Sequence, residues 1–403
     1  MNNGSTVLRE DCLRRLRGGK DVTNTVKIIT GMRRSGKSTV MRQFMEELKS
    51  SGIGADRIFL FDLESKEYDD VKDFRDLNAA IASKITVEGR VYVFLDEPQK
   101  VEKWERTVNS LMVDYDADIY ITGSNAYLLS SDIATYISGR YVEIKMLPLS
   151  FKEYIELHPP NEKKSVEVRF ADYMQYGSLP IIDPDAENKE FLNGQIEGVY
   201  NTVLVKDVLK RLKTKDVVSL EKVSKYLYSN VGNLTNTLNV SKSSGKTPTT
   251  IGEYIKALEN AYLFYKVYRY DVKGKKILKS SEKYYASDPG MRNVVLEEVG
   301  SDTGRLLENI VFLELLRRGY NVTVGSYNDL EIDFAAQRPG TGTEYFQVTE
   351  SLIQTASSER EIKPLDSVRD HRRKTILSLD RILKDPGNGI RHLNAIDWLL
   401  GEE

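Results

Sequence analysis

Apolar and polar positions follow two different periods in the N-terminal third of the chain. A β-branched run at 26–29 predicts a buried strand, and apolar residues at helical spacing over 37–50 predict an amphipathic helix. The apolar runs at 91–97 and 119–121 predict two further strands of the buried type. Buried strands that alternate with helices are typical of a parallel sheet. We therefore expect an α/β domain over residues 1–150.

The remainder of the chain divides into three segments with different patterns of apolar and polar residues. Residues 151–215 carry helical spacing interrupted by GSLP and IDPD, which predicts a helical lid. Residues 216–290 predict three helices followed by two tyrosine-rich strands, the element order of a winged helix. Residues 291–403 predict a helix at 304–319, a strand near YNVTVGSY, the strand EIDFAA, a polar turn, a further strand and a helix-rich end. The last of these three parts matches the plan of restriction-endonuclease-like folds.

The composition limits the kinds of binding partner and the cellular location that we expect. The 403 residues include 58 basic and 60 acidic residues, so a polyanion must be bound by a local basic patch rather than by the overall charge of −2. Cys12 is the one cysteine, which excludes an intramolecular disulfide. The start of the chain lacks the apolar core of a signal peptide, and no apolar run reaches the ~20 residues that span a bilayer. We expect a cytoplasmic protein without a membrane partner.

The loop between the first predicted strand and helix has the spacing of a phosphate-binding loop. Glycines there let backbone N–H groups surround phosphates at a helix N-terminus, Lys37 reaches the β and γ oxygens, and Ser38 ligates Mg²⁺. The alternative is a glycine turn without a ligand. The nucleotide-binding residues we predict are Gly31, Met32, Arg33, Arg34, Ser35, Gly36, Lys37, Ser38 and Thr39.

Two acids and two further polar residues complete the predicted ATPase site. Asp96 and Glu97 end a buried strand, where Asp96 would hold the Mg²⁺ shell and Glu97 would polarise the attacking water. The alternative for this pair is an exposed acidic turn. Asn125, after the strand at 119–121, would sense the γ-phosphate, and Arg140 would contact that phosphate in its own or a neighbouring subunit. A surface salt bridge is the alternative role of Arg140.

The predicted winged helix contains a local basic patch of the kind that a polyanion partner would need. Seven basic residues stand against two acids between 266 and 283. Lysines on such a hairpin would contact phosphates, and the outward face of the third helix would offer further contacts. The alternative is a winged helix used for packing, with lysines that only solubilise an edge hairpin. The predicted nucleic-acid contacts are Thr250, Lys256, Lys273, Lys275 and Lys276.

The C-terminal part carries an incomplete nuclease pattern. Glu308 on a helix, Asp333 on a strand and Gln347 on the next strand occupy the positions of metal-binding residues, with Glu331 nearby. Thr349 stands where such sites have a lysine, and threonine cannot supply that charge. We therefore predict a vestigial site that does not cleave. Its acids would otherwise make internal hydrogen bonds or salt bridges.

The ordered set GMRRSGKST, FLDEPQKVEKWE, ITGSN, SGRYVEIKMLPLSFKEY and GSLPII resembles a prokaryotic family of AAA+-type ATP-binding proteins with a C-terminal domain of unknown function. The resemblance covers nearly the whole chain and implies ATP and Mg²⁺ as cofactors, ATP hydrolysis, and a regulatory or nucleic-acid-linked role. The leading hypothesis is an ATP-driven switch that binds DNA or a DNA-associated protein, with a homo-oligomer as a further option. The alternatives are an ATP-gated protein-interaction module and an ATP-regulated nuclease.

Overall fold

The chain forms two compact units, residues 1–147 with 260–262 and residues 148–259 with 263–403. The computed structural model describes residues 6–129, 136–137, 139–212, 216–297, 302–353 and 355–402. Within these residues, no helix combines the length and the apolar character needed to cross a bilayer.

The first unit is built on a parallel sheet of order β2-β3-β4-β1-β5. Its strands are β1 (Val26–Thr30), β2 (Ile58–Asp62), β3 (Val91–Asp96), β4 (Ala117–Gly123) and β5 (Tyr141–Lys145). All residues of β1, β3 and β4 are buried, as the apolar runs predict. Because the strands are parallel, their carboxyl ends meet at one edge of the sheet, which is where functional side chains gather in such folds.

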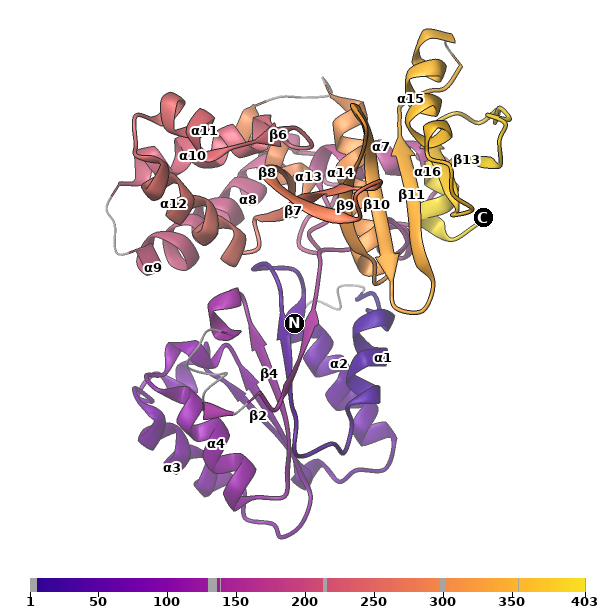
Figure 1. Cartoon of the computed structure of the whole chain (residues 1–403). Helices are drawn as coiled ribbons and strands as arrows, with labels where there is room; N and C mark the ends of the chain where they lie inside the picture. The colour runs from indigo at the N-terminus through magenta and orange to yellow at the C-terminus, as the bar shows by residue number, and fades with distance from the viewer. Residues whose placement is uncertain are drawn as a thin grey trace. The chain divides into compact units, whose positions relative to one another are not determined.

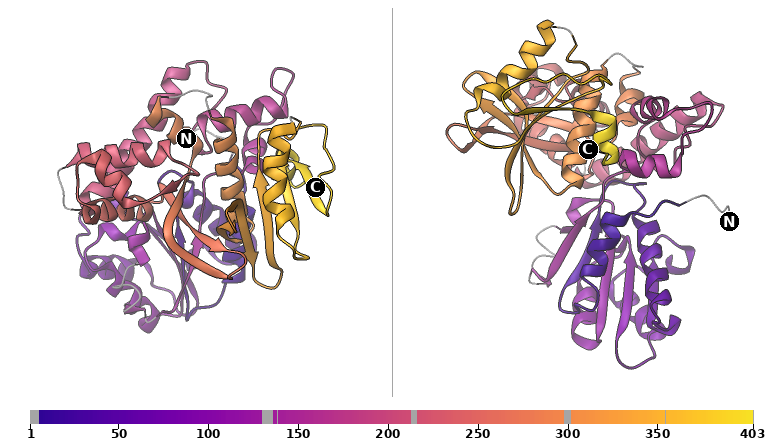
Figure 2. Two further views of the ribbon diagram at one scale, coloured as in Figure 1. Left: turned by 45° about the horizontal axis from the view of Figure 1, so that its top comes forward. Right: turned by 90° about the vertical axis from the view of Figure 1, so that its right-hand side faces the viewer.

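Helices cover both faces of this sheet (Figures 1 and 2). One core joins α1 and α2 to Ile29, Phe94 and Tyr120, and the other joins α3 and α4 to Ile28 and Ile119. Neighbouring residues of one strand thus face opposite cores, which is the alternation that the pleat of a strand imposes. The helical segments are α1 (Glu10–Gly18), α2 (Lys37–Ser50), η1 (Ala55–Arg57), η2 (Lys66–Tyr68), α3 (Phe74–Lys84), η3 (Pro98–Lys100), α4 (Trp104–Asp114) and η4 (Ala126–Leu129).

The second unit contains a mixed sheet of order β13-β12-β11-β10-β9-β7-β8-β6. β7 pairs antiparallel with β8 and parallel with β9, so the hairpin of the predicted winged helix continues into the strands that follow it. β11, β12 and β13 are parallel to one another. The strands are β6 (Leu234–Thr235), β7 (Phe264–Asp271), β8 (Lys276–Ala286), β9 (Asn321–Tyr327), β10 (Leu330–Arg338), β11 (Gly342–Val348), β12 (Lys374–Ser378) and β13 (Ile390–Asn394).

Helices form in the segments between residues 151 and 260 where helical spacing of apolar residues predicts them. α10, β6, α11, α12, β7 and β8 follow one another in the chain, and Thr247 caps α12 through a hydrogen bond from the Thr250 N–H at 3.2 Å. The helical segments are α6 (Phe151–Leu157), α7 (Val166–Tyr176), α8 (Lys189–Thr202), η5 (Val203–Leu209), α9 (Lys210–Leu212), α10 (Val217–Ser229), α11 (Thr237–Ser244), α12 (Pro248–Asn260), α13 (Pro289–Leu296), α14 (Thr303–Arg317), α15 (Thr355–Ser367) and α16 (Ala395–Leu400).

The end of the chain differs from the expected helix-rich segment. Two buried strands, β12 and β13, follow α15 and extend the sheet before the short helix α16. β12 reads KTILS and is buried at all five positions, but a run this short does not distinguish a strand from a helix by periodicity. Its pairing with β11 and β13 decides the outcome, and that pairing is a long-range property.

Candidate functional site

The loop between β1 and α2 has the backbone that a phosphate-binding loop requires. Gly36 caps α2 with φ of 99°, a conformation that favours glycine, and no side chain caps the helix. The first N–H groups of α2 are therefore not engaged by a capping side chain. Gly31 has φ of 153°, and a Cβ there would lie 2.1 Å from the Met146 carbonyl oxygen. Glycine is required at both ends of the loop.

Two buried polar side chains of this loop suit a phosphate ligand. The Lys37 ammonium donates to the carbonyl oxygens of Gly31 and Met32, both at 3.0 Å, and lies 3.8 Å from Glu97 Oε1. The Ser35 hydroxyl is buried and has no hydrogen-bond partner among the described residues. A buried hydroxyl without a partner is uncommon, because it loses its hydration without compensation. Phosphate oxygens would satisfy both groups, so the loop fits the predicted ligand.

Asp96 links the loop to the carboxyl edge of the sheet. Ser38 Oγ donates to Asp96 Oδ1 at 3.1 Å, and the Thr122 hydroxyl donates to the same oxygen. Burial raises the pKa of the Asp96 carboxyl, and the hydrogen bonds from Thr122 and Ser38 oppose that rise. A hydroxyl and a carboxylate in contact at the start of α2 are oxygen ligands of the kind Mg²⁺ prefers.

Glu97 is held by polar groups of the neighbouring strand end. Its backbone has φ of 53°, its N–H donates to Thr122 Oγ1 at 3.2 Å, and it is 8% exposed. Glu97 Oε2 accepts from the Ser124 N–H at 3.3 Å, from Ser124 Oγ at 3.1 Å and from the Gln99 amide. The buried strand end therefore replaces the exposed acidic turn considered as an alternative.

The other two predicted ATPase residues lie differently. Asn125 is buried, and its side-chain oxygen accepts from the Tyr127 N–H at 2.9 Å. Arg140 is exposed and directly precedes β5, where its carbonyl accepts from the Val26 N–H at 3.0 Å. Val26 begins β1, whereas the phosphate loop follows the other end of that strand, about 16 Å away for five residues. The structure does not bring Arg140 to the loop of its own chain.

Three residues beyond the predicted set contact this site. Ser124 and Gln99 hold Glu97, as described above, and Arg9 donates to the Ser35 carbonyl at 3.0 Å and to the Leu147 carbonyl at 2.6 Å. Arg9 is only 7% exposed. Arg9 lies 26 residues before Ser35, so no local pattern in the sequence predicts their contact. Ser124 directly precedes the predicted Asn125, so the sequence did indicate its neighbourhood.

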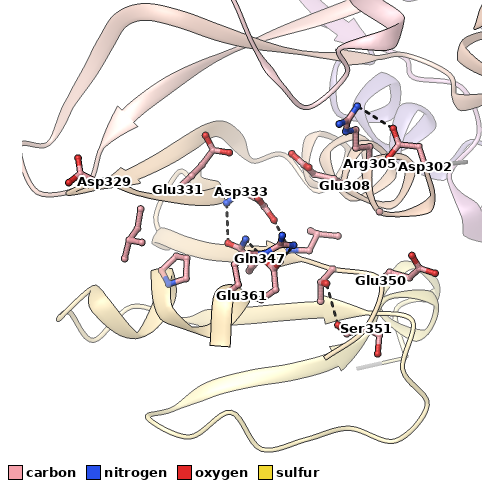
Figure 3. Close-up of a pocket in the computed structure, with 16 residues that line it drawn as sticks. Asp302, Arg305, Glu308, Asp329, Glu331, Asp333, Gln347, Glu350, Ser351 and Glu361 are labelled. Atoms are coloured by element: carbon pink, nitrogen blue, oxygen red, sulfur yellow. Dashed lines mark hydrogen bonds and ion pairs between the residues drawn. The ribbon is translucent and has the colours of Figure 1, made fainter. Parts of the chain in front are cut away.

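The second unit contains an acidic pocket of about 830 Å³ (Figure 3). Residues of α14, β10, β11 and α15 line it, including the predicted Glu308, Asp333 and Gln347. Arg305 and Arg360 are the basic side chains among its lining residues. Its acidic side chains are Asp302, Glu308, Asp329, Glu331, Asp333, Glu350 and Glu361.

Internal hydrogen bonds connect the predicted vestigial residues. The Asp333 carboxylate accepts from the Val348 N–H at 2.8 Å, and Gln347 accepts from the Asp333 N–H at 3.3 Å. Gln347 also donates to Glu361 at 2.8 Å (Figure 3). Burial raises the pKa of Asp333 well above its usual value, and the neighbouring Glu308 carboxylate raises it further. The Thr349 hydroxyl donates to the Ser351 carbonyl at 3.4 Å and supplies no charge.

A lysine outside the predicted nuclease motif lies among these acids. The Lys283 ammonium, on β8, is 3.2 Å from Glu308 Oε1 and 2.8 Å from Glu331 Oε1, and the residue is 3% exposed. Tyr285 on the same strand donates to Glu308 at 2.5 Å. The nearby carboxylates raise the pKa of Lys283, although its burial acts in the opposite direction. Sequence reasoning missed this contact because Lys283 belongs to the winged-helix part, 66 residues before Thr349.

Within the described residues, the cluster of side chains close enough together to hold a metal ion lies outside the acidic pocket. There, three ligand atoms within 4.8 Å of one another occur at His158, Asp183 and Asp185, and not in the acidic pocket. Asp185 is already paired with Arg169 at 2.7 Å and with Lys164 at 2.9 Å. Two cations on one carboxylate disfavour a third, so this cluster is no better candidate.

The predicted nucleic-acid residues divide into exposed and engaged groups. Lys273, Lys275 and Lys276 form the tip of the β7–β8 hairpin, are exposed and have no ion pair within the described residues. We call these three residues the tip lysines. Lys256 pairs with Glu259 at 3.2 Å, and the Thr250 hydroxyl lies 3.0 Å from that of Thr247.

Two other lysines of the predicted basic patch, Lys266 and Lys283, are paired with acidic side chains. Lys266 lies 3.7 Å from Glu259 and 3.5 Å from Glu282, and Lys283 is buried and paired with Glu308 and Glu331. The side chain of Lys279 lies outside the described residues. The patch is therefore reduced mainly to the hairpin tip.

The fold and the loop of the first unit define an α/β domain of the P-loop type. Residues 23–155 match the family described as "AAA domain", and residues 167–302 match a "Domain of unknown function (DUF8612)". The first unit is therefore an AAA-type, P-loop ATPase-like domain, followed by a domain whose function is not defined.

An uncharacterised protein of Haemophilus influenzae is 38% identical over 404 residues, which cover 98% of each chain. The chain belongs to the same family as that protein. An uncharacterised protein of Methanocaldococcus jannaschii is 29% identical over 85% of this chain and 78% of its own length. The solved structure of AMPPCP-bound DnaA from Aquifex aeolicus aligns at 16% identity with a TM-score of 0.31, covering 63% of this chain and 89% of that one. A likeness at that level identifies neither a shared fold nor a shared function.

Proposed function

We propose that the first unit binds ATP with Mg²⁺ at the start of α2 and hydrolyses it. The observation that carries this proposal is the convergence of Lys37, Ser38, Asp96 and Glu97 at the carboxyl edge of one parallel sheet. Lys37 and Ser38 begin α2, whereas Asp96 ends β3 and lies 58 residues after Ser38 in the sequence. Such a convergence is the arrangement that phosphoryl transfer to water requires.

Each residue has a distinct role in this proposal. Lys37 exchanges its hydrogen bonds to the loop carbonyls for contacts with phosphate oxygens, and Ser38 and Asp96 hold the ion. Bound Mg²⁺ neutralises charge on the phosphates. Glu97 orients the attacking water, and Asn125 lies close enough in sequence to Ser124 to act beside it. Ser124 and Gln99 position the Glu97 carboxylate.

Two substitutions separate binding from hydrolysis. Lys37→Ala removes a charged donor, so ATP affinity should fall by about tenfold or more. Glu97→Gln keeps the shape but not the proton acceptor, so ATP should bind normally while turnover falls by about a hundredfold or more. Fluorescent-nucleotide titration and phosphate release measure the two effects. Arg140→Ala is the matched control for binding, since that residue lies at the opposite strand end. Wild-type turnover in Glu97→Gln would refute the assignment of the base.

We further propose that the second unit binds DNA through the tip lysines, so that the protein is an ATP-driven switch. The support is the exposure of the three ammonium groups and the lack of ion pairs on them within the described residues. Exposed cations of this kind bind backbone phosphates with a strong dependence on salt. The winged-helix and restriction-endonuclease-like assignments of 216–290 and 291–403 belong to the same proposal.

The acidic pocket favours a second candidate, an ATP-gated module that binds protein. Even with Asp333 counted as neutral, the six other acidic side chains of the pocket outnumber its two guanidinium groups, so the pocket disfavours a phosphate backbone. A basic protein partner would meet no such repulsion. Weak binding to duplex and single-stranded DNA at moderate salt, together with ATP-dependent capture of a protein, would favour this candidate over the first.

A further inference from the structure

A small cavity of about 110 Å³ lies in the second unit among residues of β11, β13 and α16, which Figure 1 labels. Four arginines line it around one carboxylate: Arg318, Arg338, Arg373, Arg391 and Glu344. We call this cavity the arginine cleft. The acidic pocket has a different lining, with no residue in common.

The cleft has more positive charge than its internal carboxylate can neutralise. Arg318 has its own partner, with Nε 2.9 Å from Glu314 Oε1. Arg338 and Arg373 lie 3.9 Å and 3.6 Å from Glu344, which is beyond hydrogen-bond distance. Arg391 is exposed and has no ion pair or side-chain hydrogen bond within the described residues. Arg338, Arg373 and Arg391 therefore bring three positive charges to a cleft that has one carboxylate, Glu344, which leaves a local excess of two positive charges.

Aromatic side chains hold two of the guanidinium groups in place. Arg338 lies over the ring of Tyr320 at 4.3 Å, and Arg318 lies over the ring of Trp398 at 3.9 Å. Tyr320 also donates to Glu344 at 2.8 Å, which fixes the carboxylate. Stacking engages the face of a guanidinium and leaves its N–H groups directed outward in the ring plane. The Arg338 Nε is buried, and the part of the chain that the structure describes offers it no hydrogen-bond partner.

We propose that the arginine cleft binds one phosphate group. Arg338, Arg373 and Arg391 come from three separate segments, at the end of β10, before β12 and within β13. Donors that approach from several segments suit a tetrahedral oxyanion, whereas one guanidinium fork already satisfies a planar carboxylate. The cleft of about 110 Å³ is larger than the space that a single water molecule needs, so it has room for an oxyanion.

This site is separate from the phosphate loop and does not depend on ATP binding there. The phosphate could be inorganic phosphate or a phosphodiester of a nucleic-acid strand, because both offer the same oxygens to arginine. The experiment therefore needs two ligand arms. It also needs a signal from the cleft itself, since phosphate would bind the loop at Lys37 as well.

The two tryptophans supply that signal, because Trp398 lines the cleft and Trp104 lies in the core of the first unit. The full chain is labelled with 5-fluorotryptophan in a Lys37→Ala background, and Trp104→Phe assigns the two ¹⁹F resonances. Inorganic phosphate at constant ionic strength should shift the Trp398 resonance saturably and leave that of Trp104 unchanged. A short oligonucleotide without terminal phosphates forms the second arm. If neither ligand moves Trp398 more than sodium chloride does, the proposal is overturned.

Two substitutions change the affinity in opposite directions. Arg391→Gln removes an unpaired guanidinium and should weaken phosphate binding by about tenfold or more. Glu344→Gln removes the competing carboxylate while keeping an acceptor for Tyr320, so it should strengthen binding. Arg305→Gln, in the acidic pocket, is the matched control and should leave the affinity as it is. An affinity unaltered by both cleft substitutions would place the Trp398 response outside the cleft and contradict the assignment.

Discussion

The buried Asp333 makes the second unit sensitive to pH at the scale of a single residue. Its pKa lies well above the ordinary value because of burial and the Glu308 carboxylate. A carboxyl whose pKa is raised by folding stabilises the fold below its unfolded pKa, and this contribution is lost as pH rises through the folded pKa. The folded state therefore holds a proton that the unfolded chain has released.

Asp333→Asn should remove this dependence, because asparagine stays neutral and still accepts from the Val348 N–H. We expect the variant to gain stability relative to wild type as pH rises, by up to about 1.4 kcal/mol for each pH unit inside the window. Urea unfolding at pH 5 and pH 8, followed through Trp398, measures the difference in the free energy of unfolding between the variant and wild type. Asp329→Asn, on the exposed part of the pocket, is the control. If the stability gain of Asp333→Asn over wild type stays constant or becomes smaller toward pH 8, the raised pKa of Asp333 is contradicted.

Single residues of the first site were predictable because their signals are local. Lys37, Ser38 and Asp96 stand next to a glycine loop or at the end of an apolar run, and the structure brings them together. The partners of a residue were less predictable than the residue itself. Arg9 and Lys283 reach their sites from distant segments, and Arg140 follows a glycine at the strand end that faces away from the loop. Spacing in sequence holds no information about such contacts.

At the scale of elements, the β7–β8 hairpin places its lysines in two different environments. Lys283, far from the tip, is buried and paired with Glu308 and Glu331, whereas the three tip lysines are exposed. Both strands were predicted from their tyrosine-rich composition on either side of a basic turn, and their pairing as a hairpin is confirmed. The continuation of β7 into β9 was not predicted, because pairing between strands more than 50 residues apart depends on the whole sheet.

Replacement of all three tip lysines by alanine should weaken DNA binding without affecting folding. Up to three phosphate contacts are lost, so the slope of log affinity against log salt should fall by about 0.9 for each contact. The free energy of unfolding should change by no more than about 0.5 kcal/mol, since the side chains are exposed. A matched control replaces three other exposed lysines, Lys66, Lys152 and Lys163. If both triple variants bind DNA with the same isotherm and slope, the hairpin is not the interface.

At the scale of the whole molecule, we predict that the protein does not cut DNA. Lys283 is ion-paired with both Glu308 and Glu331, the acidic pocket lacks a three-ligand cluster within the described residues, and Thr349 carries no charge. Purified protein should therefore leave supercoiled plasmid intact with Mg²⁺ or Mn²⁺, with or without ATP. Gel analysis beside a known nuclease measures this. Nicking by wild type that disappears in Asp333→Ala would show an active site with a relocated base.

The central claim is that ATP hydrolysis in the first unit responds to DNA bound by the second. The most direct measurement is the ATPase rate of the full chain with and without DNA, for wild type and for the tip-lysine variant. We predict that DNA changes the wild-type rate, and that the variant keeps its basal rate but loses the response. Glu97→Gln should show no appreciable rate in either condition. A wild-type rate that is the same with and without DNA, at concentrations where DNA is bound, would contradict the account.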